Sequence, residues 1–250
     1  MKLEDKIIKN AAVIGYGIVG QATAKAFGIK YHYDKLDNIS NIAKCDIGNI
    51  EYLFICVPTP TINDTCNTSQ VEEVIAEFGK HTYIIRSTVI PGTADRLSKY
   101  GCNIVSNPEF LTMSTANQDA VNPDIIVLGG NKSSEIKELF YSGSNFKDST
   151  FIETDNKTAE MIKYAINTFY ATKTLFANYL YKVCIDKNIN YDTVKEAMYK
   201  RKWIGNNHLS VPYNGKFGVG GNCLPKDLTA FTSYSKNDFF KSLVKFMEQI

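Results

Sequence analysis

The chain has 250 residues, of which 44% are hydrophobic and 22% are charged, and its formal net charge is +2. This length allows one domain or two, and the composition is that of an ordinary globular protein rather than a disordered or fibrous one. The 28 basic and 26 acidic side chains are interspersed, without the basic stripe of a nucleic-acid-binding protein, so we expect no nucleic-acid partner.

Targeting, membrane and metal signals are also missing from the sequence. The charged N-terminus is not followed by an apolar segment, and the longest apolar run, at 52–58, is far too short to cross a bilayer. We therefore expect a cytoplasmic protein with no membrane partner. The six cysteines are widely spaced and form no CxxC pair or His/Cys cluster, which predicts reduced thiols and no metal site.

Short apolar runs alternate with polar, helix-compatible stretches in the first half of the chain. This rhythm predicts strand–helix–strand units and an α/β fold with a Rossmann-like, doubly wound and mostly parallel sheet. Runs that are apolar almost throughout are typical of strands covered on both faces. The expected strands are 11–15, 30–34, 52–58, 82–88, 103–106 and 125–129.

From about residue 156 the pattern changes to apolar or small residues at helical spacing, without proline or glycine, for roughly thirty residues. We predict one long helix there and a second helix from 191 to about 202. A glycine-rich loop should follow at 205–222, with helical sequence from 226 to the end. The chain then divides into a dinucleotide-binding domain, 1–155, and a mostly helical domain, 156–250.

The sequence Gly15-Tyr16-Gly17-Ile18-Val19-Gly20 follows an expected strand and opens a helix, as a dinucleotide-binding GxGxxG motif must. Its glycines permit a tight turn, a close approach to a pyrophosphate, and close packing of helix on strand. Asp34 ends the next strand, where a carboxylate would bind ribose hydroxyls and repel a 2′-phosphate, so we expect NAD rather than NADP. One alternative is that the glycine turn serves only close packing. Another is that Asp34 is a solvated carboxylate, in which case Asp37 is the nearest residue that could bind the ribose hydroxyls.

Lys163 and Asn167 lie four residues apart on the expected long helix, so both side chains project from one face. A lysine and an amide in this arrangement could hold a sugar hydroxyl for deprotonation and then stabilise the oxyanion that forms. Taken alone the pair is weak evidence, because lysine and asparagine on a helix surface are usually solvated.

Cys223 follows three glycines and precedes Pro225, a residue suited to the first position of a helix. A thiol at a helix start beside Lys226 should have a lowered pKa and so more of the nucleophilic thiolate. Asp227, four residues further, would lie on the same side of the helix and could position a water or orient the lysine. The alternatives are that Cys223 is a buried structural cysteine and that Asp227 is only a carboxylate favoured near a helix N-terminus by the helix dipole.

With these motifs in this order, the chain resembles the UDP-glucose/GDP-mannose dehydrogenase family along its whole length. Three of the six motifs are the glycine loop with Asp34, the lysine–asparagine helix and the Cys223 segment. The other three are Val57-Pro58-Thr59-Pro60, the stretch 87–93 (STVIPGT) and the stretch 107–111 (NPEFL).

The resemblance implies NAD-dependent oxidation of a nucleotide sugar, most readily UDP-glucose, at C6 from alcohol to carboxylate. Cys223 would form a thiohemiacetal and then a thioester, with Lys163 and Asn167 as oxyanion stabilisers. Thr88 and Asp227 would position the proton-transfer network, and Glu109 would be the base for hydrolysis. Further cofactor contacts are implied at Val57, Thr59, Thr88, Glu109 and Lys226, and substrate contacts at Phe110, Leu111, Lys163, Asn167, Tyr213, Gly220 and Cys223.

Two departures from the family pattern qualify this resemblance. Family members carry a third, C-terminal domain for the nucleotide, after a long helix that serves dimerisation; we expect that domain to be lacking here, and we expect a homodimer. Trp203 stands where the family usually has the arginine of Arg-Ile-Gly. Arg201 or Lys202 could replace that arginine and His208 could contact a phosphate, unless these side chains are simply solvated.

Two other hypotheses remain open from the sequence. A β-hydroxyacid-type dehydrogenase shares the dinucleotide fold and the Lys163–Asn167 spacing but lacks the Cys223 motif and the thioester step. A non-catalytic NAD-binding or assembly subunit would retain the motifs without turnover. The favoured hypothesis requires the Cys223 sulfur, the Lys163 ammonium and the nicotinamide ring to meet in one pocket.

Overall fold

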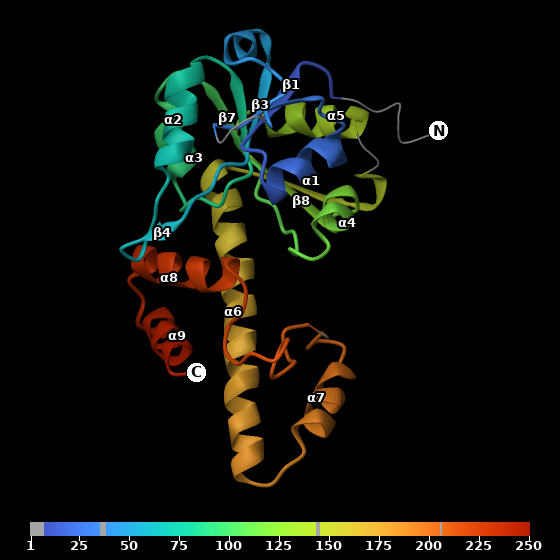
Figure 1. Cartoon of the computed structure of the whole chain (residues 1–250), viewed down its shortest axis with the longest axis vertical. Coiled ribbons are helices and arrows are strands. Elements are labelled where there is room, and N and C mark those ends of the chain that lie inside the picture. Colours follow the sequence, from blue (N-terminus) through green and yellow to red (C-terminus); the bar gives the residue numbers. More distant parts are fainter. Residues whose placement is uncertain (1–7, 36–38, 144–145, 206) are drawn as a thin grey trace. The chain divides into compact units, whose positions relative to one another are not determined.

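A computed structural model describes residues 8–35, 39–143, 146–205 and 207–250 (Figure 1). The described chain forms two compact units. The first contains the residues up to Pro60 together with Asn67–Lys163, and the second contains Thr61–Cys66 and Tyr164–Ile250. The domain boundary near residue 155 stays a prediction.

The first unit is built on a seven-stranded sheet with the order β2-β1-β3-β6-β7-β8-β9. Neighbouring strands pair in parallel except β7 and β8, which are antiparallel. The predicted α/β class with a doubly wound, mostly parallel sheet is therefore confirmed. The strands are β1 (Ala11–Ile14), β2 (Tyr31–Tyr33), β3 (Tyr52–Ile55), β6 (Thr82–Ile85), β7 (Asn103–Ser106), β8 (Ile125–Gly129) and β9 (Thr150–Thr154).

Helices cover both faces of this sheet, which explains why its strands are apolar almost throughout (Figure 1). Along β1, Val13 belongs to one buried cluster with Phe27 of α1, and the next residue, Ile14, belongs to a second cluster with Val71 of α2. The helices of this unit are α1 (Ile18–Phe27), α2 (Ser69–Phe78), α3 (Thr93–Ser98), α4 (Ala116–Val121) and α5 (Ser133–Gly143), with 3-10 turns at Lys44–Asn49 and Phe146–Asp148.

The strand order reverses at β1, because the chain passes from β1 to β2 on one side and later to β3 on the other. In open α/β sheets, ligands bind in the crevice outside the carboxyl ends of the strands at such a switch point. The glycine loop lies there: the Gly15 N–H donates to the Tyr33 carbonyl at 2.9 Å, and the Cys56 N–H donates to the Ile14 carbonyl at 2.8 Å.

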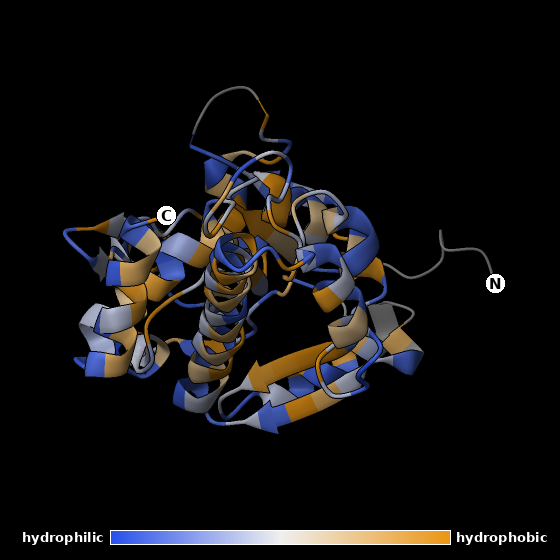
Figure 2. Ribbon diagram, turned by 90° about the horizontal axis from the view of Figure 1, so that it is seen from below, coloured by the Kyte–Doolittle hydropathy of each residue, from blue (hydrophilic) through white to orange (hydrophobic). Residues whose placement is uncertain are grey.

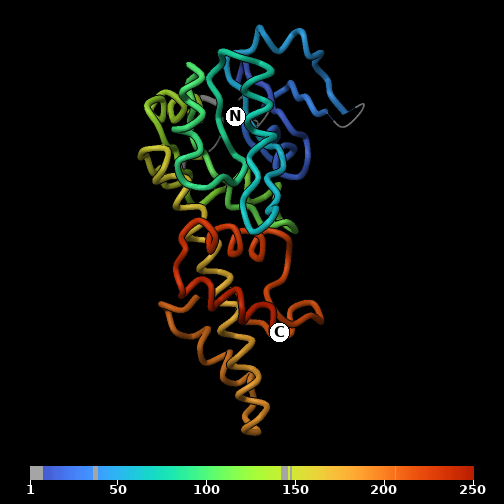
Figure 3. The backbone as a smooth tube through the Cα atoms, turned by 90° about the vertical axis from the view of Figure 1, so that its left-hand side faces the viewer, coloured from blue at the N-terminus to red at the C-terminus, as the bar shows by residue number. Residues whose placement is uncertain are grey.

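The second unit consists of a short hairpin and four helices. The hairpin strands β4 (Thr61–Ile62) and β5 (Thr65–Cys66) pack on α8, and the Thr61 hydroxyl donates to the Lys226 carbonyl at 3.0 Å (Figure 3). The helices are α6 (Asn156–Asp186), whose first turns belong to the first unit, α7 (Tyr191–Tyr199), α8 (Cys223–Ser235) and α9 (Asp238–Glu248).

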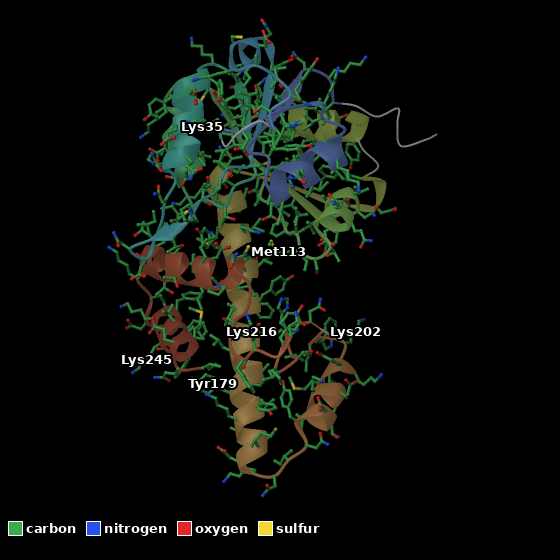
Figure 4. The ribbon with its side chains drawn as sticks, in the orientation of Figure 1. Lys35, Met113, Tyr179, Lys202, Lys216 and Lys245 are labelled. Carbon is green, nitrogen blue, oxygen red and sulfur yellow. The ribbon has the colours of Figure 1, made fainter. Side chains whose placement is uncertain are left out.

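The predicted long helix is confirmed as α6, which mixes hydrophobic and hydrophilic residues around its circumference (Figure 2). The second helix ends at Tyr199, earlier than expected. The C-terminal helical sequence is divided at Lys236, which has φ +53°, and Asn237, whose side chain caps α9. Tyr179 of α6 donates its hydroxyl to the Phe246 carbonyl of α9 at 3.2 Å (Figure 4). Within the described residues, no helix combines the length and apolar character needed to cross a membrane.

Candidate active site

The three glycines of the loop serve different purposes. A Cβ at Gly20 would lie 2.0 Å from the Gly15 carbonyl oxygen, and one at Gly15, where φ is +89°, would lie 2.9 Å from backbone atoms of Cys56. These two positions therefore require glycine for close packing and for the turn. A Cβ at Gly17 would meet no atom within 4 Å. That open space at the N-terminus of α1 fits the pyrophosphate of a dinucleotide.

Asp34 lies directly beside the glycine loop. Its Oδ2 accepts the Tyr16 N–H at 2.6 Å, and the Tyr16 ring stacks on the His32 ring with 3.6 Å between centroids. The carboxylate is thus held beside the glycine loop just after β2, the place from which an acidic residue reaches the ribose hydroxyls of NAD. Asp37, the competing candidate, lies outside the described residues, and no sequence pattern had pointed to His32.

The loops that follow β3 and β6 are bonded to each other. The Thr59 hydroxyl donates to the Thr88 carbonyl at 2.6 Å, and the Ser87 hydroxyl donates to the Val57 carbonyl at 2.7 Å. Because β3 and β6 are neighbours with the same direction, their carboxyl ends bring these loops to one edge of the sheet. The structure therefore brings together the predicted residues Val57, Thr59 and Thr88.

Lys163 is not a solvated surface lysine. It is 5% exposed, and its Nζ donates to the Glu109 carbonyl at 2.5 Å and lies 3.2 Å from Glu109 Oε1. The other carboxylate oxygen of Glu109 accepts the Leu111 N–H at 2.6 Å, and the ammonium lies 5.3 Å from the centroid of the Phe110 ring. The helix and the loop 109–111 thus hold one buried ion pair.

Asn167, one turn further along α6, is also buried. Its Nδ2 donates to Asp227 Oδ2 at 2.6 Å, and the fully buried Asp227 is 2.5 Å from Lys226 Nζ through its other oxygen. A buried carboxylate requires such partners. This hydrogen bond fastens the first turn of α8 to α6.

Cys223 is the first residue of α8 and is exposed, so it is not the buried structural cysteine of the alternative interpretation. Asn222 precedes the helix without a side-chain cap, and no acidic residue occupies the first turn. Cys223 thus stands in the first turn of a helix, where backbone N–H groups favour a thiolate, and its reactivity stays a prediction. Pro225 is the third residue of the helix rather than the first, still within the turn where a missing N–H costs nothing.

The remaining predicted contacts lie in the segment between α7 and α8. Tyr213 is exposed and pairs with Lys216 in a tight turn, and a Cβ at Gly220 would meet no atom within 4 Å. Their roles in substrate binding, and the meeting of Cys223 with Lys163 and a nicotinamide ring, stay predictions.

The side chains around Trp203, which stands where the family usually has an arginine, are largely solvated. Trp203 is 84% exposed, and the Lys202 Nζ lies 5.2 Å from the centroid of its ring. Arg201 is also exposed. His208 is instead half-buried and stacks on Tyr170 with 4.4 Å between ring centroids. Burial, together with the charge of a nearby lysine, lowers the pKa of His208. A neutral histidine is a poor ligand for a phosphate at neutral pH.

Two buried charged residues had not been assigned roles from the sequence. Arg86, 7% exposed, donates to Asn107 Oδ1 at 2.5 Å and, with Glu109, lines a cavity of about 280 Å³. Glu160, 3% exposed, accepts two backbone N–H groups at the start of α3. The position of Glu160, three residues before Lys163 on the same helix, was a possible signal for the second. Among the described residues, no group of three or more His, Cys, Asp or Glu side chains could hold a metal ion.

Three features together define an NAD-binding dehydrogenase fold. They are the glycine loop at a switch point of a parallel sheet, the open space at a helix N-terminus, and the acidic residue after the second strand. Residues 30–142 match the NAD-binding domain of the UDP-glucose/GDP-mannose dehydrogenase family, and residues 157–250 match its central domain. The chain belongs to this family and carries its NAD-binding domain.

Relatives with assigned names agree with this placement. The chain is 32% identical over 213 residues to UDP-glucose 6-dehydrogenase of Rickettsia bellii, covering 80% of this chain and 48% of that protein. It is 33% identical over 219 residues to the putative UDP-glucose 6-dehydrogenase YtcA of Bacillus subtilis, covering 80% and 50%. The chain therefore spans about half the length of the curated relatives it matches.

Solved structures share the fold. A UDP-glucose dehydrogenase from Pyrobaculum islandicum superposes with a TM-score of 0.82 at 23% identity, covering 96% of this chain and 68% of that one. The UDP-D-ManNAc dehydrogenase from Pyrococcus horikoshii gives a TM-score of 0.82 at 22% identity, with the same coverage. At this identity the likeness shows the fold alone.

Proposed function

We propose that the chain catalyses NAD-dependent oxidation of a nucleotide sugar at C6, from alcohol to carboxylate, with UDP-glucose as the first substrate to test. The observation that carries this proposal is that α6 holds two buried polar side chains one turn apart, each engaged by a carboxylate. Lys163 pairs with Glu109, and Asn167 pairs with Asp227 in the turn that presents the exposed Cys223.

In the first oxidation, the C6 hydroxyl loses its proton and its carbon loses a hydride. NAD, when bound, accepts that hydride. Negative charge develops on the C6 oxygen as its proton leaves, before loss of the hydride gives the neutral aldehyde, and the Lys163 ammonium and the Asn167 amide are the donors we assign to that charge. Both side chains are buried and fixed by partners, so they need no reorganisation as the charge forms. The proton passes to a water held by the network that Thr88 and Asp227 position.

In the second oxidation, the Cys223 thiolate attacks the aldehyde carbon, and a carbon–sulfur bond forms as the carbonyl becomes an oxyanion. The same two donors stabilise this thiohemiacetal. Loss of a second hydride from the carbon, with a second NAD as its acceptor, turns the oxyanion back into a carbonyl and gives a thioester on Cys223. Water, deprotonated by Glu109, then adds to the thioester carbonyl, and cleavage of the carbon–sulfur bond releases the acid and restores the thiolate.

We also infer that the enzyme is a homodimer whose copies meet along α6. Three exposed apolar side chains lie on this helix at seven-residue intervals: Phe169 is 64% exposed, Phe176 is 55% exposed and Val183 is 52% exposed. A seven-residue period keeps side chains on one side of a helix and is the pattern of helix–helix seams. Large apolar groups in such a row are stabilised when a second helix covers them.

The first experiment mixes the purified chain with NAD and UDP-glucose and measures NADH and product. Two NADH per sugar, with a carboxylate product, support the proposal. One NADH with release of aldehyde indicates a dehydrogenase without the thioester step, and no NADH with UDP-glucose or any related nucleotide sugar indicates a non-catalytic subunit.

A substitution tests the role of the thiol. Cys223→Ser should abolish acid formation and leave NAD binding intact, because a serine hydroxyl lacks the nucleophilicity of a thiolate at neutral pH. Cys45→Ser, at another exposed cysteine, is the matched control and should retain activity. Acid production at the wild-type level by Cys223→Ser would contradict the covalent mechanism.

A further inference from the structure

Glu160 joins three segments of the first unit. It lies in α6 and is 3% exposed. Its Oε2 accepts the Gly92 N–H at 2.5 Å, its Oε1 accepts the Ala94 N–H at 2.8 Å, and the Ser106 hydroxyl lies 3.4 Å from Oε1. One carboxylate therefore connects α6 to the start of α3 and to the end of β7.

These segments carry two of the side chains to which the oxidation was assigned. Thr88 lies four residues before Gly92 in the loop that leaves β6, and Lys163 lies three residues after Glu160 on α6. Thr88, Glu160 and Lys163 all line one small cavity of about 10 Å³. Residues three apart on a helix are neighbours on its surface. Displacement of Glu160 would thus change the separation of Thr88 and Lys163.

The two backbone bonds need both oxygens of Glu160 to be acceptors. An ionised carboxylate accepts at each oxygen, whereas a protonated carboxyl carries a hydrogen on one of them and an amide carries two on its nitrogen. Either change would turn one donor–acceptor contact, at Gly92 or at Ala94, into a contact between two donors. A buried N–H group that loses its acceptor stays unsatisfied and destabilises the folded state.

We propose that Glu160 is a positioning residue for the oxidation, which holds the Thr88 loop and Lys163 in place through these two bonds in its ionised form. This inference rests on the function proposed above only for its effect on turnover. The effect on the loop itself follows from the bonds to Gly92 and Ala94 and can be measured without a substrate.

The ionisation of Glu160 falls within the neutral range. Burial raises the pKa of its carboxyl from 4.5 to about 7, the Asp95 carboxylate adds to the rise, and the N–H donors of Ala94 and Gly92 oppose it. The charged groups that face it are Asp95 on α3 and Lys163 on α6, while Ser106 on β7 and Thr88 are neutral.

Stability and loop position should respond to pH in opposite directions. Between pH 4.5 and about 7 the folded chain keeps a proton that the unfolded chain has released, so the stability from this group is full below pH 4.5 and is lost as the pH rises to about 7. The pair of backbone bonds, by contrast, is complete only when Glu160 is ionised. Turnover should therefore rise as the pH passes about 7, where this decrease in stability levels off.

The test compares Glu160→Gln with the wild-type chain and with Glu138→Gln, a surface control on α5. Urea unfolding between about pH 4.5 and 8 should show a one-proton decrease in stability for the wild type and the control, and no such decrease for Glu160→Gln. With UDP-glucose and NAD, kcat should fall roughly 10- to 100-fold in Glu160→Gln. A wild-type pH dependence of unfolding, or a wild-type kcat, in Glu160→Gln would overturn the inference.

A second measurement needs no variant. Amide hydrogen exchange in the wild-type chain should show protection at Gly92 or Ala94 that falls as the pH drops below about 7, after correction for intrinsic exchange. Constant protection would refute the role of the carboxylate. A wild-type chain that oxidises no nucleotide sugar would refute the proposed function, and the exchange and unfolding data would then still decide whether Glu160 holds the loop.

Discussion

Replacement of Asn167 by leucine removes the donor of the 2.6 Å hydrogen bond to Asp227 and keeps the number and branching of the side-chain heavy atoms. The fully buried Asp227 would retain its contact with Lys226 but lose the amide. Because a hydrogen bond to a charged group contributes about 1.5 to 3 kcal/mol, we expect Asn167→Leu to lower the free energy of unfolding by that amount.

The double variant decides whether this loss belongs to the pair. Asp227→Leu should also destabilise the chain, because it leaves the Asn167 amide buried without its acceptor. Asn167→Leu/Asp227→Leu should cost less than the sum of the two single changes by about 1.5 to 3 kcal/mol, since two apolar side chains of similar shape leave neither group unsatisfied.

Urea unfolding of the wild type, the two single variants and the double variant measures this coupling, with circular dichroism at neutral pH as the signal. Asn190→Ala is the control: it removes the cap that accepts the Thr193 N–H at 3.1 Å, should cost about 1 kcal/mol, and should add to Asn167→Leu without coupling. If the Asn167 and Asp227 changes also add to within about 0.5 kcal/mol, the hydrogen bond does not hold α8 to α6.

Three other predictions concern the cofactor loop and the dimer. Gly20→Ala should destabilise the chain by about 2 to 3 kcal/mol or prevent folding, because the new Cβ would lie 2.0 Å from the Gly15 carbonyl oxygen. Gly17→Ala should keep stability within about 1 kcal/mol and lose NAD affinity, and equal affinity in a titration would contradict this. Phe176→Ser should shift sedimentation from dimer to monomer with an unchanged circular dichroism spectrum, whereas Tyr100→Ser, at an exposed residue of the first unit, should not.

The pattern of hydrophobic residues predicted the strands that are buried on both faces of the sheet. Each of the six expected strands is present, although β3 ends at Ile55 rather than at residue 58, because the chain turns away where β1 ends. Strand β9 was not predicted, since it is only partly buried and its sequence Thr150–Thr154 lacks a continuous apolar run. The β4–β5 hairpin was also missed, although Asn63 and Asp64 both adopt positive φ in its turn, a conformation these residue types tolerate.

The order of motifs predicted which residues to examine, but not their partners. Glu109 and Lys163 are 54 positions apart, and Asn167 and Asp227 are 60 positions apart. Nothing in local spacing says that these side chains meet. The hydrogen bonds of Glu160 were missed for the same reason: its oxygens accept the N–H groups of Gly92 and Ala94, which lie 68 and 66 positions earlier in the chain.

The amino-acid sequence by itself determined the class of fold, the dinucleotide loop, the long helix and the family, because periodicity and glycine positions are local properties of the chain. Only the tertiary structure decided that Lys163 is buried against Glu109, that Asp227 is fully buried against Asn167, and that Cys223 is exposed. Burial and partnership depend on which distant segments pack together, and that packing sets the charge, the hydrogen bonds and the access of each group.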